Sequence, residues 1–199
     1  MALVGKSKQD IVSEFRCAQI LAAARKIFAT KGFRDATVDD IAAEAGIAKG
    51  TVYLYYPSKK EMYLEALKQG LQELRQRTGA AMHAAAGAQA KLRAFVRTRM
   101  EYAEANRDFF RIYHSEFGNL TNDSEFQQLY LQQAKTLEAV LHTAGRKGEI
   151  RRIRADFSAF LIYDMVKSVM IQRLLGRSTA RLDDDIETLT ELIWKGIAV

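Results

Sequence analysis

The sequence contains one cysteine and one proline among 199 residues, and it has no run of 18 apolar residues. A single cysteine, Cys17, cannot form an intrachain disulfide, and the lack of a pairing partner is typical of a reducing compartment. Without a long apolar run, no membrane-spanning helix and no membrane partner are expected. The first ten residues, MALVGKSKQD, lack the apolar centre of a secretory signal. Together these absences predict a cytoplasmic protein.

Recognisable catalytic and metal-binding motifs are also missing. No glycine-rich phosphate loop, no G-x-S-x-G and no H-E-x-x-H occurs in the sequence. His83, His114 and His142 are far apart in the sequence and have no second ligand at a zinc-binding spacing. The three aspartates at 183–185 are typical of a helix start and not of an acid–base pair. We therefore predict that the protein is not an enzyme and has no metal or cofactor site.

The charge is distributed unevenly along the chain. The net charge is +6, and residues 1–60 contain 10 Lys and Arg against 6 Asp and Glu, which leaves +4 in less than a third of the sequence. A basic end of this kind indicates a polyanionic partner. Simple solubility accounts for the charge equally well, so the charge alone does not decide the function.

The composition favours helix throughout, because proline is scarce and Ala, Leu, Glu, Lys, Gln and Arg are abundant. No alternation of period two marks a strand. We predict an all-α fold of about nine helices, with a three-helix unit in residues 1–57 and a larger helical body in residues 58–199. Ser58 and Glu61 form a capping box at the start of the body. The helices are expected at 13–30, 38–45, 48–55, 59–80, 89–104, 107–117, 124–143, 156–175 and 184–197.

The segment TVDDIAAEAGIAKGTVYLYYPSKKEM, residues 37–62, has the order of a helix-turn-helix unit. Two short helices meet at Gly46, and the small or aliphatic residues on their inner sides allow a close crossing. The second helix begins with Lys49, Gly50 and Thr51, and in this motif that turn enters the major groove of DNA. Lys49 and Thr51 can bond to base edges or phosphates, Gly50 has no side chain to hold the helix away, and the neighbouring hydroxyls and Lys59 would bind phosphates. The predicted DNA contacts are Thr37, Lys49, Gly50, Thr51, Tyr53, Tyr55, Tyr56 and Lys59.

This segment resembles the DNA-binding signature of TetR-family transcriptional regulators. The shared features are a threonine before the second helix, the pattern IA..AG, a Gly-Thr-aromatic recognition helix, and YYPSK followed by Lys-Glu. The upstream stretch ILAAARKIFATKGFRDAT resembles the first helix of the family, and the resemblance extends over residues 15–67. It implies a homodimeric repressor that binds a palindromic operator in double-stranded DNA. It also implies that a small molecule in the C-terminal domain moves the helix at 59–80 and so releases the operator.

A plain helical interaction module, using its basic end for membranes or acidic proteins, is the competing class. It leaves unexplained why charge, glycine and tyrosine follow one another in the order of a recognition helix. Binding to duplex DNA that weakens steeply with salt distinguishes the two classes, because only phosphate contacts require it.

Two C-terminal helices have more apolar surface than one core requires. The helix at 156–175 is apolar on more than one face, which indicates burial on both sides. The helix at 184–197 repeats Ile and Leu every three or four residues. We expect the two to pair with their symmetry mates as a four-helix interface, although both stripes could instead be the internal core of a monomer. The predicted interface residues are Phe157, Leu161, Met165, Leu175, Ile186, Leu189, Ile193 and Ile197.

The middle helices combine many aromatic residues with a few polar groups, which is typical of small-molecule pockets in helical bundles. Aromatic stripes at helical spacing are also typical of an ordinary core, so both interpretations stay open. The predicted pocket residues are Phe95, Arg99, Tyr102, Phe110, Tyr113, His114, Phe117, Tyr130, Tyr163 and Asp164. We expect a small lipophilic effector. As an alternative, AGRKGEIRRI and the helix that follows resemble TetR regulators that sense acyl-CoA thioesters, and Arg99 or Arg107 would then neutralise an anionic ligand.

Overall fold

The computed structural model describes residues 7–115 and 124–199, and in these ranges the all-α prediction is confirmed. The only β pairing there is an isolated bridge between Ile150 and Ala198. No helix in these ranges is long and apolar enough to cross a membrane. The helices are α1 (Lys8–Asp35), α2 (Val38–Ala45), α3 (Lys49–Tyr55), α4 (Lys59–Ala84), α5 (Gly87–Ala105), α6 (Arg107–Ser115), α8 (Ser124–Leu131), α9 (Lys135–Lys147), α10 (Ala155–Leu174) and α11 (Leu182–Ile197).

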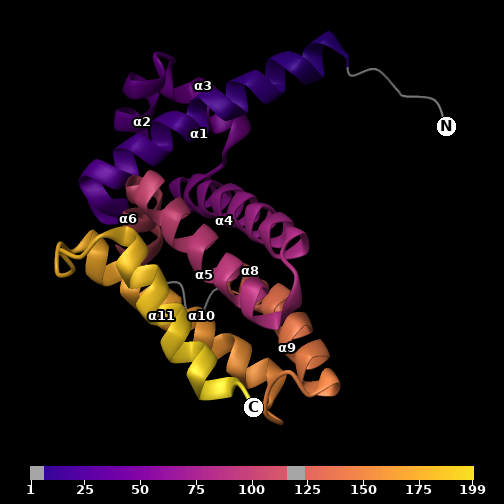
Figure 1. Cartoon of the computed structure of the whole chain (residues 1–199). Coiled ribbons are helices and arrows are strands. Elements are labelled where there is room, and N and C mark those ends of the chain that lie inside the picture. The colour runs from indigo at the N-terminus through magenta and orange to yellow at the C-terminus, as the bar shows by residue number, and fades with distance from the viewer. Residues whose placement is uncertain (1–6, 116–123) are drawn as a thin grey trace.

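Helix α1 is longer than the sequence pattern predicts. It begins at Lys8 because Ser7 and Asp10 form a capping box, in which the hydroxyl of Ser7 accepts a hydrogen bond from the amide of Asp10 at 3.1 Å. Its regular part ends where expected, since Gly32 has a φ of 76° that interrupts the helix. The first turns of α1 extend beyond α2 and α3 (Figure 1), and they expose the apolar side chains Ile11 and Phe15.

Helix α5 is the centre of the larger body, and α4, α9, α10 and α11 all pack against it. Figure 1 shows α4 and α11 on opposite sides of α5. Phe95 and Val96 of α5 are completely buried in this arrangement. Helix α4 has 26 residues and therefore spans about 39 Å, from the three-helix unit to the far end of the body.

The single helix expected at 124–143 is wrong, because the chain forms two helices there, α8 and α9. Residues 132–134 form turns between them, and the amide of Gln133 donates to the carbonyl oxygen of Tyr130 at 3.0 Å. The side chain of Gln133 is turned inward at this break and is 3% exposed. It accepts a hydrogen bond from Arg99 of α5, a tertiary contact that helical periodicity does not encode.

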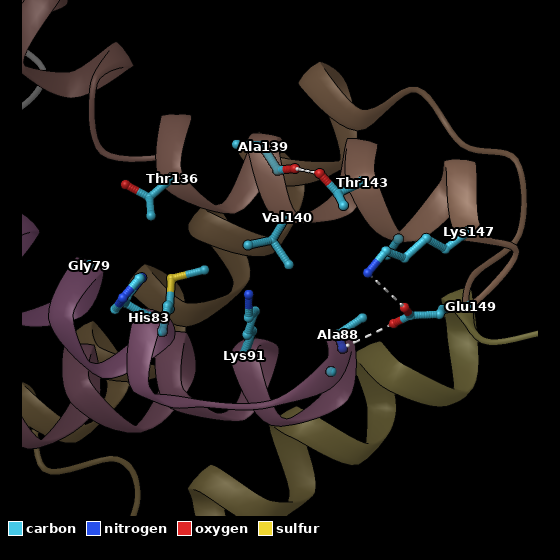
Figure 2. A pocket seen from close by; sticks show the side chains of 13 residues that line it. Gly79, His83, Ala88, Lys91, Thr136, Ala139, Val140, Thr143, Lys147 and Glu149 are labelled. Carbon is cyan, nitrogen blue, oxygen red and sulfur yellow. Dashed lines mark hydrogen bonds and ion pairs between the residues drawn. The ribbon is translucent and has the colours of Figure 1, made fainter.

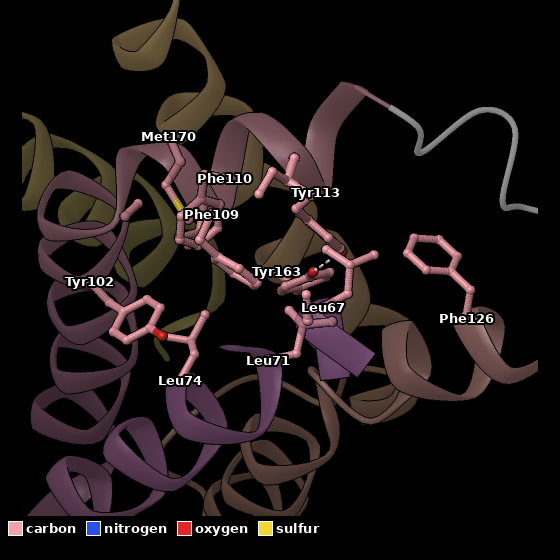
Figure 3. Packing of buried hydrophobic residues seen from close by; sticks show 14 of the residues in the cluster. Leu67, Leu71, Leu74, Tyr102, Phe109, Phe110, Tyr113, Phe126, Tyr163 and Met170 are labelled. Atoms are coloured by element: carbon pink, nitrogen blue, oxygen red, sulfur yellow. Dashed lines mark hydrogen bonds between the residues drawn. The ribbon is translucent and has the colours of Figure 1, made fainter. Parts of the chain in front are cut away.

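Aromatic side chains fill the space between α4, α5, α6 and α10 (Figure 3). Phe109, Phe110 and Tyr113 of α6 lie next to one another, and the rings of Phe109 and Phe110 meet edge to face with their centroids 5.1 Å apart. Tyr102 of α5 packs edge to face on both phenylalanines. This geometry is favourable for aromatic pairs, and it gives α6 a well-defined position against the bundle.

Candidate DNA-binding surface and effector site

The turn between α2 and α3 has the geometry of a helix-turn-helix unit. Thr37 and Asp40 form a capping box at the start of α2, with the Asp40 amide donating to the Thr37 hydroxyl at 3.1 Å. Gly46 ends α2 in the left-handed conformation, with a φ of 67°. A residue with a side chain would be strained there, so glycine fixes the angle at which α3 leaves α2. Hydrogen bonds from Lys31 and Thr37 lower the pKa of the Asp40 carboxyl to about 2.

The first turn of α3 is open on its outer side. Lys49 and Gly50 are exposed, and a side chain placed at Gly50 would have nothing within 4 Å. Tyr53 is 46% exposed, while Thr51 and Tyr55 are half-buried. Val52 is completely buried and holds the inner side of α3 to the unit. The predicted contacts Thr37, Lys49, Gly50, Thr51, Tyr53 and Tyr55 therefore include no fully buried side chain.

Asp39 of α2 is a partner of the recognition helix that the sequence analysis missed. Its carboxylate lies 2.7 Å from the ammonium of Lys49, and both side chains are well exposed. The hydrogen bond that Lys49 donates to Asp39 raises the pKa of Lys49. A phosphate or base that bound Lys49 would have to replace this carboxylate, so Asp39 is a competitor for any anionic partner of the same ammonium group. The two residues face each other across the turn, a proximity that only the folded unit reveals.

Lys59 has a different environment from the one expected of a phosphate contact. Its ammonium donates to the carbonyl oxygens of Ala36 at 2.7 Å and Arg34 at 3.1 Å. It also lies 4.7 Å from the centre of the Phe33 ring. These bonds satisfy carbonyl groups where α1 ends and attach that end to the start of α4. The side chain thus has a structural role in the free protein.

Tyr56 also differs from its predicted role. Its side chain is 9% exposed and belongs to the core, where it lies beside Cys17 of α1. Burial raises the pKa of the Tyr56 hydroxyl. A buried ring cannot fill the flank of a DNA groove without moving, so we omit Tyr56 from the DNA contacts proposed below.

Six of the ten predicted pocket residues are buried in the body of the protein. Tyr130 and Asp164 are half-buried and joined by a hydrogen bond of 2.6 Å from the phenol to the carboxylate. His114 is exposed on α6 and does not face the interior, and Phe117 lies outside the described residues. The six buried residues are Phe95, Arg99, Tyr102, Phe110, Tyr113 and Tyr163.

Arg99 is the most unusual member of this group, since it is a charged side chain that is only 2% exposed. Its guanidinium carbon lies 5.1 Å from the Phe95 ring centre and 4.9 Å from that of Tyr163. One nitrogen, Nη2, donates to Gln133 at 3.2 Å, whereas Nε and Nη1 are buried without a hydrogen-bond partner. Burial lowers the pKa of Arg99. The hydroxyl of Tyr163 lies 2.9 Å from that of Tyr113.

Three cavities lie along α4, and the one at its start, of about 290 Å³, is bordered by Tyr55, Tyr56 and Glu125. None of the nine described residues of the predicted pocket lines either of the other two, here called the first and second cavities. The first, of about 370 Å³, lies between the end of α4, the start of α5 and α9, and Figure 2 shows the amine of Lys91 pointing into it. At its rim, Glu149 accepts from the amide of Ala88 at 3.2 Å and lies 4.0 Å from the Lys147 ammonium. The second, of about 330 Å³, lies between α4 and α8 and reaches Gln133.

The two cavities lie end to end along the seam between α4 and the α8–α9 segment. Arg75 and Gln132 line the second cavity, and Gly79 and Thr136, one turn farther along each helix, line the first. A hydrogen bond of 2.8 Å from Arg75 to Gln132 separates the two. In the described ranges, no three His, Cys, Asp or Glu side chains gather as a metal site would require.

The predicted interface residues are divided between the surface and the interior. On α10, Phe157 and Leu161 are 53% and 50% exposed, Leu175 just beyond it is 55% exposed, and Met165 is half-buried. On α11 the expected stripe faces inward instead: Ile186, Leu189 and Ile193 are buried against their own chain, and Ile197 is half-buried. The reason is that α11 packs on α5, so the apolar side of α11 is buried against α5 of the same chain. The outer side of α11 exposes Leu192 instead, at 62%.

Two family models match this chain. Residues 20–66 match the model described as bacterial regulatory proteins of the tetR family, and residues 85–171 match a tetracyclin repressor-like C-terminal domain. The first match covers α2, α3, the turn between them and the start of α4. It therefore includes the helix-turn-helix unit and the exposed first turn of α3.

Characterised regulators and solved structures agree with these matches. The chain is 25% identical over 186 residues to the transcriptional activator FasR of Mycolicibacterium smegmatis, covering 92% of this chain and 83% of that one. It is 32% identical over 121 residues to the transcriptional repressor KstR2 of Rhodococcus jostii, covering 61% and 58%. A transcriptional regulator from Saccharomonospora viridis in complex with choline superimposes with a TM-score of 0.80 at 26% identity, covering 94% and 99%. The matched region spans 83% of FasR and 58% of KstR2, and it spans 28% of a third regulator, YfiR of Bacillus subtilis. The chain therefore covers less than two thirds of the length of two of these three relatives.

Proposed function

We propose a function from the premise that the chain belongs to the TetR family of bacterial transcriptional regulators. In our proposal it is a DNA-binding repressor that acts as a homodimer on a palindromic operator and is released by a small lipophilic effector. Residues 1–57 form the DNA-binding domain, and residues 58–199 form the effector-binding and dimerisation domain. Because its target is DNA, we place the protein in the cytoplasm, and we assign it no catalytic role.

The observation that carries the proposal is the open first turn of α3. Lys49 and Gly50 are exposed at the start of this helix, and the absence of a side chain at Gly50 permits close approach to base edges. Thr37 and Tyr53 are exposed beside it and offer hydroxyls to phosphates. A short helix that is fixed on one side by Val52 and free on the other is suited to the major groove.

Binding to duplex DNA tests this function directly. We expect the protein to bind a fragment of its own promoter region with an affinity that falls steeply between about 50 and 200 mM salt. Lys49→Ala should weaken binding to that fragment by about 1–3 kcal/mol and bring it closer to binding of random DNA. Lys135→Ala is the control, because Lys135 is an exposed lysine on α9, which belongs neither to the DNA-binding surface nor to the proposed dimer surface. Absence of binding at low salt would defeat the proposal.

The dimer is proposed through the outer sides of α10 and α11. Phe157, Leu161, Leu175 and Leu192 are each at least 50% exposed, and apolar surface left exposed on neighbouring helices marks interaction sites. Leu161→Asp should shift the protein from dimer to monomer in analytical ultracentrifugation at micromolar concentration. Phe15→Asp is the matched control, because Phe15 is 67% exposed on α1 and is not part of this surface. A monomeric wild-type protein would contradict the dimer.

The effector is proposed to act through α4. This helix begins at Lys59 beside the DNA-binding domain and lines both cavities farther along its length. A cavity of about 370 Å³ is within the range of small-molecule sites. A ligand that tilts α4 would move α3 relative to its partner in the dimer, and the two recognition helices must lie about 34–36 Å apart to read one operator. Derepression of a reporter gene in a strain that lacks the protein would support repression, whereas loss of transcription would indicate an activator.

A further inference from the structure

We infer that Arg99 binds the carboxylate of the effector, which reaches it through the cavity between α4 and α8 by displacing Gln133. This rests on the proposed function only in that the ligand is taken to be the regulatory effector. The ligand class is an organic monocarboxylate with an apolar body.

The state of Arg99 in the free protein is the first reason. Its guanidinium is buried, and its one hydrogen-bond partner among the described residues is the neutral amide of Gln133. Only Nη2 has a hydrogen bond, while Nε and Nη1 have none. A buried charge is strongly unfavourable unless an opposite charge and hydrogen bonds compensate for its lost hydration. Two aromatic rings compensate in part, but they cannot accept the unused N–H groups in the plane of the guanidinium.

The geometry of the guanidinium selects the ligand class. Arginine presents its N–H groups in a planar fork, and a carboxylate matches this fork with two parallel hydrogen bonds. The residue that now occupies one of these positions is Gln133, whose side-chain oxygen accepts from Nη2 at 3.2 Å. A neutral amide oxygen is a weaker acceptor than a carboxylate oxygen, so a carboxylate ligand would replace it favourably.

A route to Arg99 exists along Gln133. This residue lines the cavity of about 330 Å³ between α4 and α8, and it separates that cavity from the guanidinium. Gln133 lies in the turn between α8 and α9, where its amide donates to the carbonyl oxygen of Tyr130 at 3.0 Å and its side-chain nitrogen donates to that of Leu129 at 3.0 Å. Displacing the side chain therefore breaks its bonds to Arg99 and Leu129 but no bond of a regular helix. The cavity of about 370 Å³ lies farther along the same seam, beyond the hydrogen bond from Arg75 to Gln132, and Met82, Val140 and Ala144 give it apolar walls. The body of the ligand reaches this cavity only if that exposed hydrogen bond also opens.

Lys91 is the competing anchor for an anion. Its amine points into the 370 Å³ cavity (Figure 2), and it has no ion pair among the described residues. Lys91 is only half-buried, however, so water already solvates its charge, whereas the charge of Arg99 has no such solvation. A carboxylate therefore gains more at Arg99, and variants of the two residues give opposite predictions.

Thermal shift measurements without DNA test the site, using two acids and their matched neutral alcohols. The probes are decanoate against decan-1-ol and phenylacetate against 2-phenylethanol. We expect at least one acid to raise the Tm of the wild-type protein more than its alcohol does. This preference for the acid should disappear in Arg99→Met and persist in Lys91→Met. Equal shifts for acid and alcohol in both pairs, or loss of the preference in Lys91→Met alone, would overturn the proposal.

Gln133→Glu is a second variant, and it keeps Arg99. It places a carboxylate of nearly the same shape beside Nη2 of Arg99, so the protein itself supplies the missing anion. We expect the Tm of the unliganded variant to rise by at least about 2 °C, and the preference for the acid to vanish. The variant also loses the hydrogen bond of 3.0 Å from the side-chain nitrogen of Gln133 to the carbonyl oxygen of Leu129, so its response to the probes is the decisive measurement. A Gln133→Glu variant that keeps the wild-type preference for the acid would overturn the proposal even if Arg99→Met fails to fold.

DNA binding is measured in parallel so that the two proposals can fail separately. Wild-type protein that prefers the acids but does not bind its promoter DNA would defeat the proposed function and leave the carboxylate site standing. Wild-type protein that binds the DNA but responds equally to acids and alcohols would defeat only the carboxylate site.

Discussion

Substitution of Gly70 on α4 by alanine tests whether the close contact between α4 and α6 stabilises the body of the protein. A Cβ atom at Gly70 would lie 2.2 Å from Cε2 of Phe109 and 2.6 Å from Cδ2 and Cζ of the same ring. Phe109 cannot yield easily, because it is 8% exposed and packs against the rings of Tyr102, Phe110 and Tyr113. Gly70→Ala therefore forces a displacement in a closely packed core, which typically costs about 1–3 kcal/mol.

The gain in helix propensity opposes this cost, and Gly79→Ala on the same helix measures that gain alone. Alanine is favoured over glycine inside a helix by about 1 kcal/mol. A Cβ at Gly79 would have nothing within 4 Å, so Gly79→Ala should stabilise the protein by about that amount. For Gly70→Ala the two contributions add up to a net loss of about 0–2 kcal/mol. The variants should therefore differ by about 1–3 kcal/mol, or about 2–12 °C in Tm for a chain of this size.

Circular dichroism during thermal unfolding, at one fixed protein concentration, measures this difference. The concentration must be constant because the proposed dimer would contribute to the apparent stability. Equal Tm values for the two variants would refute the reasoning, since they would show that α6 moves away from α4 at no cost. Urea unfolding of both variants provides the free energies on an independent scale.

The remaining predictions concern the DNA-binding domain. Lys59→Ala should lower the free energy of unfolding by about 1–3 kcal/mol, because it removes two charged hydrogen bonds to carbonyls. Lys8→Ala, at an exposed lysine of α1, should change it by less than about 0.5 kcal/mol in the same urea titration. If Lys59→Ala left the stability unchanged but weakened DNA binding, Lys59 would be a phosphate contact, as predicted from the sequence, and not a structural residue. Asp39→Asn should strengthen binding to random DNA in fluorescence anisotropy at low salt, since it frees Lys49 and removes a negative charge; unchanged affinity would contradict the competition. The pKa of Asp40 is lowered to about 2 in the folded protein, so its contribution to stability is present above the pKa of the unfolded chain and is lost as the pH falls from about 4 to 2. Asp40→Asn should flatten this part of the profile of Tm against pH. An unchanged profile would show that ionised Asp40 does not contribute to the stability of the folded protein.

The elements that were predicted well are those determined by neighbouring residues. The range of α2, 38–45, agrees with the structure at both ends, because Thr37 and Asp40 form the first cap and Gly46 the last. The start of α4 also agrees, because Ser58 accepts from the amide of Glu61 at 3.1 Å. These bonds join residues three positions apart, so the sequence contains all the information that they need.

The errors occur where distant parts of the chain meet. The break between α8 and α9 depends on Arg99, 34 residues before Gln133. The inward stripe of α11 depends on α5, and no periodicity distinguishes an apolar side that faces its own subunit from one that faces a partner. The role of Lys59 depends on carbonyls 23 and 25 residues earlier. Arg99 was included among the pocket residues, but its two unused nitrogens could be recognised only from the structure.

A continuous set of buried contacts connects Arg99 with the DNA-binding domain. Arg99 lies against the ring of Tyr163, whose hydroxyl meets that of Tyr113 on α6. On the same helix, the carbonyl oxygen of Ile112 accepts a hydrogen bond of 2.5 Å from Tyr63 of α4.

The ring of Tyr63 in turn packs edge to face on Phe28 and Phe33 of α1, and Lys59 lies over Phe33. Packed side chains transmit a displacement from one site to another only if a structural element that connects the sites can adopt two arrangements. Contact between the side chains does not by itself establish that two arrangements exist. Helix α6 touches α1, α4, α5 and α10 at once, so it is the element in which two such arrangements must be sought. Phe109, which packs against Gly70 of α4, also belongs to α6. A substitution at Gly70 that displaces α6 should therefore change both the stability of the body and the response of the DNA-binding domain to the proposed effector.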